Sequence, residues 1–217
     1  MTQESSVALA LQELEYAFRR MSEHRGEPVV VRREFMQFVQ FTKKLIDYSR
    51  KEFKAQTGQN LRVASFSRWT PVTALFKELR RVDAHESPVS IKVRETLFFL
   101  VGALPEGVGG FPPSIAVTGV RELTDAFAET VPEGLRLVPC NPVTGEPIAG
   151  QSYEAAARQY AYHLEPRTDK LAALLEAAKT DDVHLLCGQC LAVFRDYVRF
   201  FSESLARPPA TNQRGAS

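Results

Sequence analysis

The feature that most constrains the fold is a long amphipathic segment in the first quarter of the chain. Between residues 30 and 56, apolar side chains recur every three or four positions, which is the spacing of one helix face. They are Phe35, Phe38, Phe41 or Thr42, Leu45 and Tyr48. Gly58 follows as a stop signal, since glycine commonly ends a helix. The segment is therefore predicted to be one long helix with most of its charged side chains off the apolar stripe.

The same spacing predicts further helices on both sides of the middle of the chain. Thr70 and Pro71 suit the N-cap and the first position of a helix. Pro88 disfavours helical geometry at the residue before it, so that helix is expected to end near His85. The predicted helices, besides 30–56, cover residues 5–24, 70–85, 120–129, 153–164, 168–179 and 181–205.

The middle of the chain has a different pattern. Residues 90–102 and 114–119 are rich in β-branched and aromatic side chains, and the connection between them is crowded with proline and glycine, which predicts an antiparallel pair. LRLVPC suggests a third strand, and NPVTGEP at 141–147 a turn. We therefore expect a mainly α (α+β) fold: a single domain over 1–205, built as a helical bundle with a small antiparallel β insertion at about 88–140.

Composition and charge limit the classes of protein to which the chain can belong. The 217 residues are 44% hydrophobic with a net charge of +1, so no global basic field favours nucleic acid and any such contact must be local. There is no apolar run of membrane-spanning length, and the first 20 residues lack the pattern of a signal peptide. The odd number of cysteines, three, does not suggest a disulfide framework. We expect a cytoplasmic protein without membrane contact, whose tail, 206–217, is disordered.

The stretch FKELRRVDAHESP at 76–88 contains residue types suited to proton transfer and phosphate binding. A histidine can transfer a proton near neutral pH, and an arginine can hold a phosphate through two hydrogen bonds. Arg81 and His85 are four residues apart and share a helix face, whereas Arg80 and His85 are five apart and point away from each other in a regular helix. The alternative interpretation is that both arginines are solvated cations at a helix C-terminus.

An arginine, a polar residue, three further residues and a histidine, placed late on a helix of a helical bundle, resemble the motif of the HEPN superfamily. Arg80 to His85 carry the match, followed by Pro88 and strands, and the order of elements is similar over residues 5–105. Arg81 stands where the family usually has asparagine, aspartate or histidine.

The resemblance implies a metal-independent endoribonuclease of a toxin–antitoxin or phage-defence system. By this resemblance, His85 would be the general acid/base of RNA cleavage and Arg80 would bind the phosphate. Two copies of the chain would pair so that both motifs line one cleft. RNA would be the substrate, and an antitoxin or another regulatory protein a further partner. The alternative is a non-catalytic HEPN-like module for interaction or dimerisation.

The basic and aromatic stretch at 41–54 is a second candidate for contact with RNA. Cations interleaved with Phe and Tyr can hold single strands by charge and stacking, although any amphipathic helix gives the same alternation. The candidate cations are Lys43, Lys44, Arg50 and Lys51.

The cysteines allow three interpretations. Cys187 and Cys190 form a CxxC, with His184 before them and Cys140 far upstream, which is the right number of ligands for structural zinc. A redox pair is the second possibility. The third, which we favour, is that both side chains are buried on an apolar helix face, so that the protein needs no metal and no cofactor.

Overall fold

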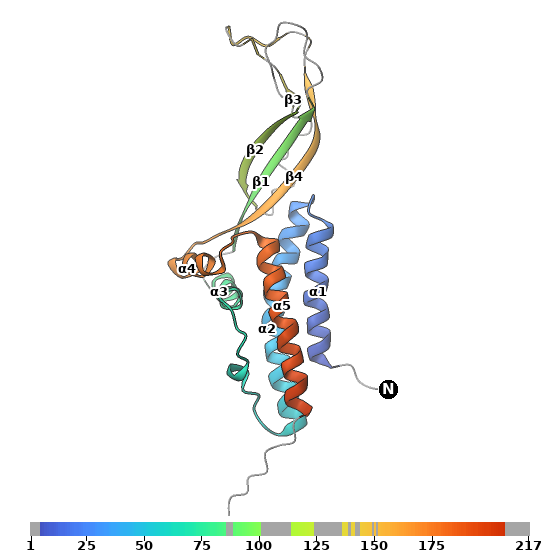
Figure 1. Cartoon of the computed structure of the whole chain (residues 1–217), viewed down its shortest axis with the longest axis vertical. Coiled ribbons are helices and arrows are strands. Elements are labelled where there is room, and N and C mark those ends of the chain that lie inside the picture. Colours follow the sequence, from blue (N-terminus) through green and yellow to red (C-terminus); the bar gives the residue numbers. More distant parts are fainter. Residues whose placement is uncertain are drawn as a thin grey trace, which may run out of the picture.

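In the computed structural model the described residues form five α-helices and a small sheet along one long axis (Figure 1). The structure describes residues 5–85, 89–100, 114–123, 136–138, 140–141, 144–148, 150 and 152–206. The elements within them are α1 Ser6–Glu23, α2 Pro28–Thr57, the 3₁₀ turn η1 Val63–Ser65, α3 Pro71–His85, β1 Ser90–Leu100, β2 Ser114–Glu122, β3 Arg136–Leu137, β4 Tyr153–Glu165, α4 Asp169–Ala178 and α5 Val183–Ala206. The prediction of a mainly α fold with a small antiparallel β part is confirmed.

The helices begin and end at residues whose side chains or backbone suit those positions. The Ser5 hydroxyl caps α1 by accepting hydrogen bonds from the backbone N–H groups of Val7 and Ala8. Pro28 opens α2, where its missing N–H costs nothing. Gly58 ends α2 with φ +69°, in the left-handed region that glycine enters without strain. Thr168 caps α4 through the Leu171 N–H. Local sequence thus fixes most of the boundaries that were predicted.

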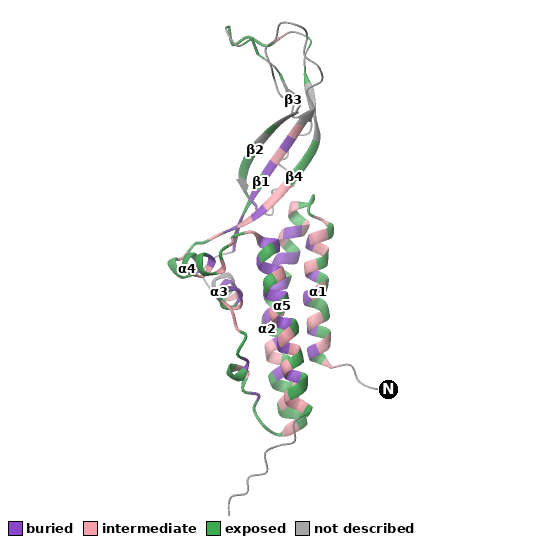
Figure 2. Ribbon diagram, viewed as in Figure 1, coloured by how far each residue is buried: buried purple, intermediate pink, exposed green. Residues whose placement is uncertain are grey.

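The helices pack around one hydrophobic core. α1, α2 and α5 lie side by side along the long axis, and α3 crosses beside them (Figure 1). The buried faces of α1, α2 and α5 turn toward one another, and the exposed residues cover the outside (Figure 2). Phe38 of α2 and Phe76 of α3 meet with ring centroids 5.3 Å apart, so α3 is anchored to α2 through aromatic packing. The largest fully buried side chains include Leu14, Phe35, Phe38, Phe76, Leu186 and Tyr197.

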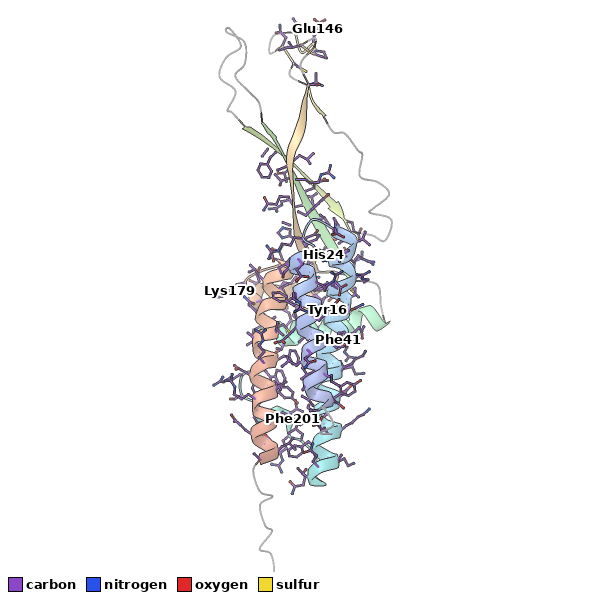
Figure 3. The ribbon with its side chains drawn as sticks, turned by 90° about the vertical axis from the view of Figure 1, so that its right-hand side faces the viewer. Tyr16, His24, Phe41, Glu146, Lys179 and Phe201 are labelled. Atoms are coloured by element: carbon purple, nitrogen blue, oxygen red, sulfur yellow. The ribbon has the colours of Figure 1, made fainter. Side chains whose placement is uncertain are left out.

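The sheet extends beyond one end of the bundle. Its strand order is β2-β1-β4-β3, and all pairs are antiparallel. Along the base of β1 the side chains alternate: Ile91 and Val93 are buried, whereas Lys92 and Arg94 are exposed. His24 lies at the end of the bundle nearest the sheet, Phe201 near its other end, and Glu146 at the far end of the β part (Figure 3).

Two contacts of β4 join the sheet to the helices. The hydroxyl of buried Tyr162 donates to the Arg25 carbonyl, between α1 and α2, at 2.7 Å. The Leu164 N–H donates to the Asp181 carbonyl, just before α5, at 2.8 Å. The base of the sheet is therefore part of the same core as the bundle.

Two predicted helices are corrected. The segment expected as a helix over 153–164 is the strand β4, which pairs with β1 from Ser90 opposite Glu165 to Phe99 opposite Ala155. Its alanines favour a helix locally, but the long pairing with β1 outweighs that preference. Residues 120–122 belong to β2, so no helix begins at Val120. The β part therefore reaches residue 165, beyond the expected limit of about 140.

The remaining expectations divide into three groups. The antiparallel pair of strands is confirmed over residues 90–100 and 114–119, and among the described residues of LRLVPC a strand is formed by Arg136 and Leu137. The turn at 141–147 is confirmed by the hydrogen bond from the Gly145 N–H to the Asn141 carbonyl. The expected helix over 123–129 and the tail from 207 lie largely or wholly outside the described residues. Within the described part, no helix is long and apolar enough to cross a membrane.

Candidate functional site

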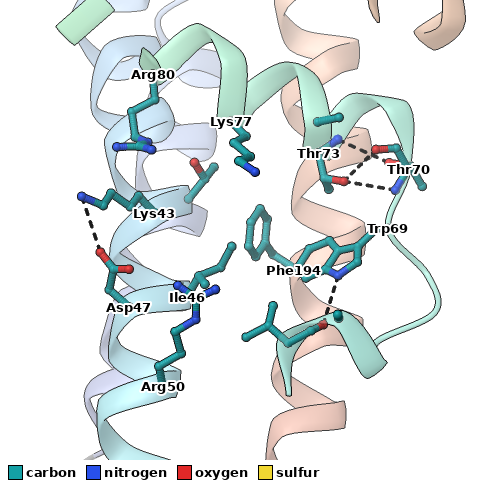
Figure 4. A pocket seen from close by; sticks show the side chains of 14 residues that line it. Lys43, Ile46, Asp47, Arg50, Trp69, Thr70, Thr73, Lys77, Arg80 and Phe194 are labelled. Atoms are coloured by element: carbon teal, nitrogen blue, oxygen red, sulfur yellow. Dashed lines mark hydrogen bonds and ion pairs between the residues drawn. The ribbon is translucent and has the colours of Figure 1, made fainter. Parts of the chain in front are cut away.

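A groove of about 550 Å³ opens between α2, α3, α5 and the turn η1 (Figure 4). This volume lies in the range of about 300–1,000 Å³ that is typical of ligand sites. The lining combines aliphatic and aromatic side chains, cations on α2 and α3, threonines and one carboxylate.

The apolar wall is formed by Trp69, Phe194 and Val63, and Ile46 adds an apolar side chain from α2. The indole N–H of Trp69 donates to the Val63 carbonyl at 3.2 Å. The Trp69 ring packs against Phe66 and Tyr197, with ring centroids 4.9 and 5.2 Å away. Trp69 is half-buried and lines the groove. These contacts fix the orientation of the indole before any ligand arrives.

Four cations line the groove from two helices. Lys43 and Arg50 are seven residues apart on α2, which is about two turns, so they share a face. Lys77 and Arg80 are three residues apart on α3 and extend toward α2 (Figure 4). Asp47 is the one acidic residue in the described lining, and it pairs with Lys43 at 3.7 Å. Among the described residues, no ion pair or hydrogen bond engages the side chains of Arg50, Lys77 and Arg80.

This charge is local to the groove. The chain as a whole carries a net charge of +1, whereas the groove combines four cations with one carboxylate. Cations gathered at a concave surface with an apolar wall raise the local potential and attract anions. The arrangement therefore suits a ligand that has both an anionic group and an apolar or aromatic part.

Arg81 lies outside the groove lining, although it follows Arg80 directly. Its Nε donates to Oε1 of Glu78 at 2.8 Å. Lys170 of α4 pairs with the other oxygen of Glu78 at 2.6 Å. Glu78 itself is buried, with 4% of its surface exposed. The hydrogen bond from Lys170 and that from Arg81, opposed by burial, hold the pKa of Glu78 below its ordinary value. Arg81 thus contributes to a cluster that joins α3 to α4.

The other predicted site residues are distributed over several places. His85 is the last residue of α3, five positions after Arg80, and its side chain lies outside the described residues. The Lys44 ammonium lies over the Phe41 ring, 4.7 Å from its centroid. Lys51 lies near Ser5 and Glu52, beside the start of α1. Lys43 and Arg50 line the groove with Arg80, whereas Lys44 and Lys51 do not.

Most of the groove residues, Lys77 and Trp69 among them, are absent from the site residues predicted from the sequence. Lys77 could have been found from its spacing, because it precedes Arg80 by three positions on the same helix. Trp69 directly precedes the Thr70-Pro71 helix start, but its place beside α5 depends on how the connection folds.

The cysteines are not assembled into a zinc site. Cys187 and Cys190 are fully buried in α5, and burial raises the pKa of both thiols well above the ordinary value. Nε2 of His184 is hydrogen-bonded to the Met21 carbonyl at 3.0 Å. Cys140 is exposed in the β part, opposite Pro147. Within the part of the chain that the structure describes, no three His, Cys, Asp or Glu residues are placed to share a metal ion. The pair in α5 thus packs as small apolar side chains.

Comparisons of the chain with protein-family models, with curated proteins and with solved structures found no significant match.

Proposed function

We propose that this protein binds single-stranded RNA in the groove between α2 and α3, as a HEPN-like module of the cytoplasm. The observation that carries the proposal is the position of Arg80. This arginine belongs to the HEPN-like motif, and it lines a groove in which Lys43, Arg50 and Lys77 supply further cations. Cations beside an aromatic wall are what a flexible strand with charged phosphates and unpaired bases requires.

The binding experiment uses a fluorescently labelled single-stranded RNA of twelve nucleotides and its anisotropy. We expect Lys43→Ala and Arg80→Ala to weaken binding several-fold each, because each removes a phosphate contact. Lys44→Ala is the matched control, since it makes the same change of charge one residue further along α2 and outside the groove. Equal affinity of the Lys43 and Lys44 variants, or no binding by the wild-type protein, would contradict the proposal.

A second candidate function is RNA cleavage, which is favoured by the presence of Arg80 on the groove and of His85 at the end of the same helix. A ribose 2′-hydroxyl would attack its own phosphodiester. The new 2′-O–P bond forms as the P–O5′ bond breaks, leaving a 2′,3′-cyclic phosphate and a 5′-hydroxyl. His85 would take the proton from the 2′-hydroxyl and return a proton to the leaving oxygen, and Arg80 would neutralise the phosphate. By the resemblance, two copies of the chain would pair to form the complete cleft.

Cleavage is tested with the same RNA in EDTA, followed on a denaturing gel. We expect cyclic-phosphate products from the wild-type protein and none from His85→Ala, with RNA binding by that variant retained. Cleavage that is equal in both proteins would come from a contaminating nuclease. RNA binding without cleavage by a homodimer would leave the non-catalytic module as the function.

A further inference from the structure

We infer that the groove holds an unpaired base against Trp69, so that it selects single strands through their exposed bases and reads little of their sequence. This inference rests on the proposed binding of RNA. It concerns the wall opposite the cations, which the HEPN-like motif does not include. In Figure 4, Trp69 and Phe194 lie on one side of the groove, and Lys43, Asp47 and Arg50 lie on the other. A ligand that reaches both sides must combine a flat apolar part with a charged part.

The chemistry of Trp69 indicates how that part is bound. The only hydrogen-bond donor of its side chain, the indole N–H, is already engaged with the Val63 carbonyl. What the residue offers the groove is therefore its aromatic surface. Because every base has a flat aromatic face, such contact is tolerant of sequence. Trp69 is also held by Phe66 and Tyr197, so little side-chain freedom is lost when a base arrives.

The threonines of the groove are also largely engaged with the backbone. The Thr42 hydroxyl donates to the Val39 carbonyl at 2.7 Å. The Thr73 hydroxyl donates to the Thr70 carbonyl at 2.7 Å and accepts from the Thr70 N–H at 3.1 Å. These hydroxyl protons are not available to read the edge of a base. With these two hydroxyl protons engaged, the cations supply charge and Trp69 supplies an aromatic surface, which fits recognition by stacking and charge.

A duplex does not meet these requirements. Its bases are stacked on each other and its phosphates face outward, so only the cations at the rim could be contacted. A single strand can turn one base toward Trp69 and place the neighbouring phosphates on Lys77 and Arg80, which extend from α3 at the upper edge of the groove (Figure 4). The expected ligand is hence an unpaired nucleotide within a strand.

The test uses the intrinsic fluorescence of Trp69, which is the only tryptophan among the 217 residues. The full-length protein is titrated with a twelve-nucleotide oligouridylate, an oligoadenylate of the same length, a duplex of the same length and inorganic polyphosphate. We expect both single strands to quench Trp69. Duplex and polyphosphate should bind more weakly or leave the fluorescence unchanged, because they bring no unstacked base.

Two variants separate stacking from general loss of structure. Trp69→Leu should bind single strands about tenfold more weakly, the scale expected for loss of one stacked base. Trp69→Phe keeps an aromatic ring and should recover most of the affinity, with circular dichroism confirming that both variants fold. Single strands that bind by anisotropy, with unchanged Trp69 fluorescence and equal affinity for Trp69→Leu, would overturn this inference and leave the proposed function standing. If the single strands fail to bind at all, the proposed function itself fails.

Discussion

Arg80 and Arg81 are neighbours in the sequence but lie on different sides of α3. Arg80 lines the groove with Lys77, while Arg81 donates to buried Glu78 at 2.8 Å in the contact between α3 and α4. Consecutive residues on a helix point about 100° apart, so one arginine can face a ligand site while the next supports the fold. The two arginines of the motif therefore differ in role, and substituting each one alone separates binding from stability.

Arg80→Ala is expected to weaken binding of single-stranded RNA several-fold, because a charge-assisted phosphate contact is lost. Its unfolding temperature should stay close to that of the wild type, since the side chain has no partner in an ion pair among the described residues. Arg81→Ala should show the opposite pattern, with nearly unchanged affinity and a loss of stability within about 1 kcal/mol, because its side chain is 46% exposed. Anisotropy and thermal unfolding of both variants check this. Loss of binding in Arg81→Ala alone would contradict the assignment of Arg80.

The affinity for RNA should depend on salt in proportion to the number of cations used. If three of the groove cations contact phosphates, the logarithm of the association constant should fall against the logarithm of salt with a slope of about −2. Lys77→Ala should reduce the steepness by about 0.7, which corresponds to one contact on a single strand. Lys51→Ala, with the same change of charge beside the start of α1, should leave the slope unchanged. Anisotropy titrations at several salt concentrations measure the slope. Equal slopes for the Lys77 and Lys51 variants would argue against binding of RNA in the groove.

The Glu78 cluster should make stability depend on pH. The pKa of Glu78 is held below its ordinary value, so the unfolded chain binds this proton more readily than the native state. The stabilisation is therefore complete above the ordinary pKa of 4.5 and is lost as pH falls through the lower native value. Glu78→Gln should cost about 1–3 kcal/mol at pH 7, and this difference from the wild type should shrink in acid.

Chemical denaturation at pH 7 and at low pH measures that difference. Glu203→Gln, on the exposed side of α5, is the control and should change stability little at either pH. A cost of Glu78→Gln that is the same at both values would mean that the carboxylate charge is not what stabilises the contact between α3 and α4.

The junction between sheet and bundle should depend on one buried hydroxyl. Tyr162→Phe removes the hydrogen bond to the Arg25 carbonyl and leaves that carbonyl without this donor, at an expected cost of about 0.5–1.5 kcal/mol. Tyr160→Phe is a matched control two residues away on β4, because the Tyr160 hydroxyl makes only long contacts, donating to Glu95 at 3.4 Å and accepting from Arg158 at 3.3 Å, and is expected to matter less. The free energy of unfolding is measured for the wild type and both variants. Equal losses in the two variants would show that the Tyr162 hydroxyl does not stabilise the junction.

The helices could be predicted from the sequence because their signals are local. Ser5, Gly58 and Thr168 cap or end helices through residues only a few positions away. The strand β4 could not, because its alanines favour a helix and only pairing with β1, about 60 residues earlier, determines its conformation. The groove could be predicted in part. Lys43, Arg50 and Arg80 were expected to bind RNA, but their convergence with Trp69 depends on how α3 packs across α2 and α5.

The burial of the cysteines predicts their reactivity. Cys187 and Cys190 lie in the core, and burial raises the pKa of both thiols, so little thiolate forms at neutral pH and reagents cannot reach it. Cys140 is exposed. A thiol reagent such as dithionitrobenzoate should therefore react rapidly with one cysteine of the native protein and with all three after unfolding. Cys140→Ser should remove the rapid phase, and mass spectrometry of the labelled peptides identifies the residue. Rapid labelling of Cys187 or Cys190 in the folded protein would show that α5 opens readily, against the close packing around Leu186, Phe194 and Tyr197.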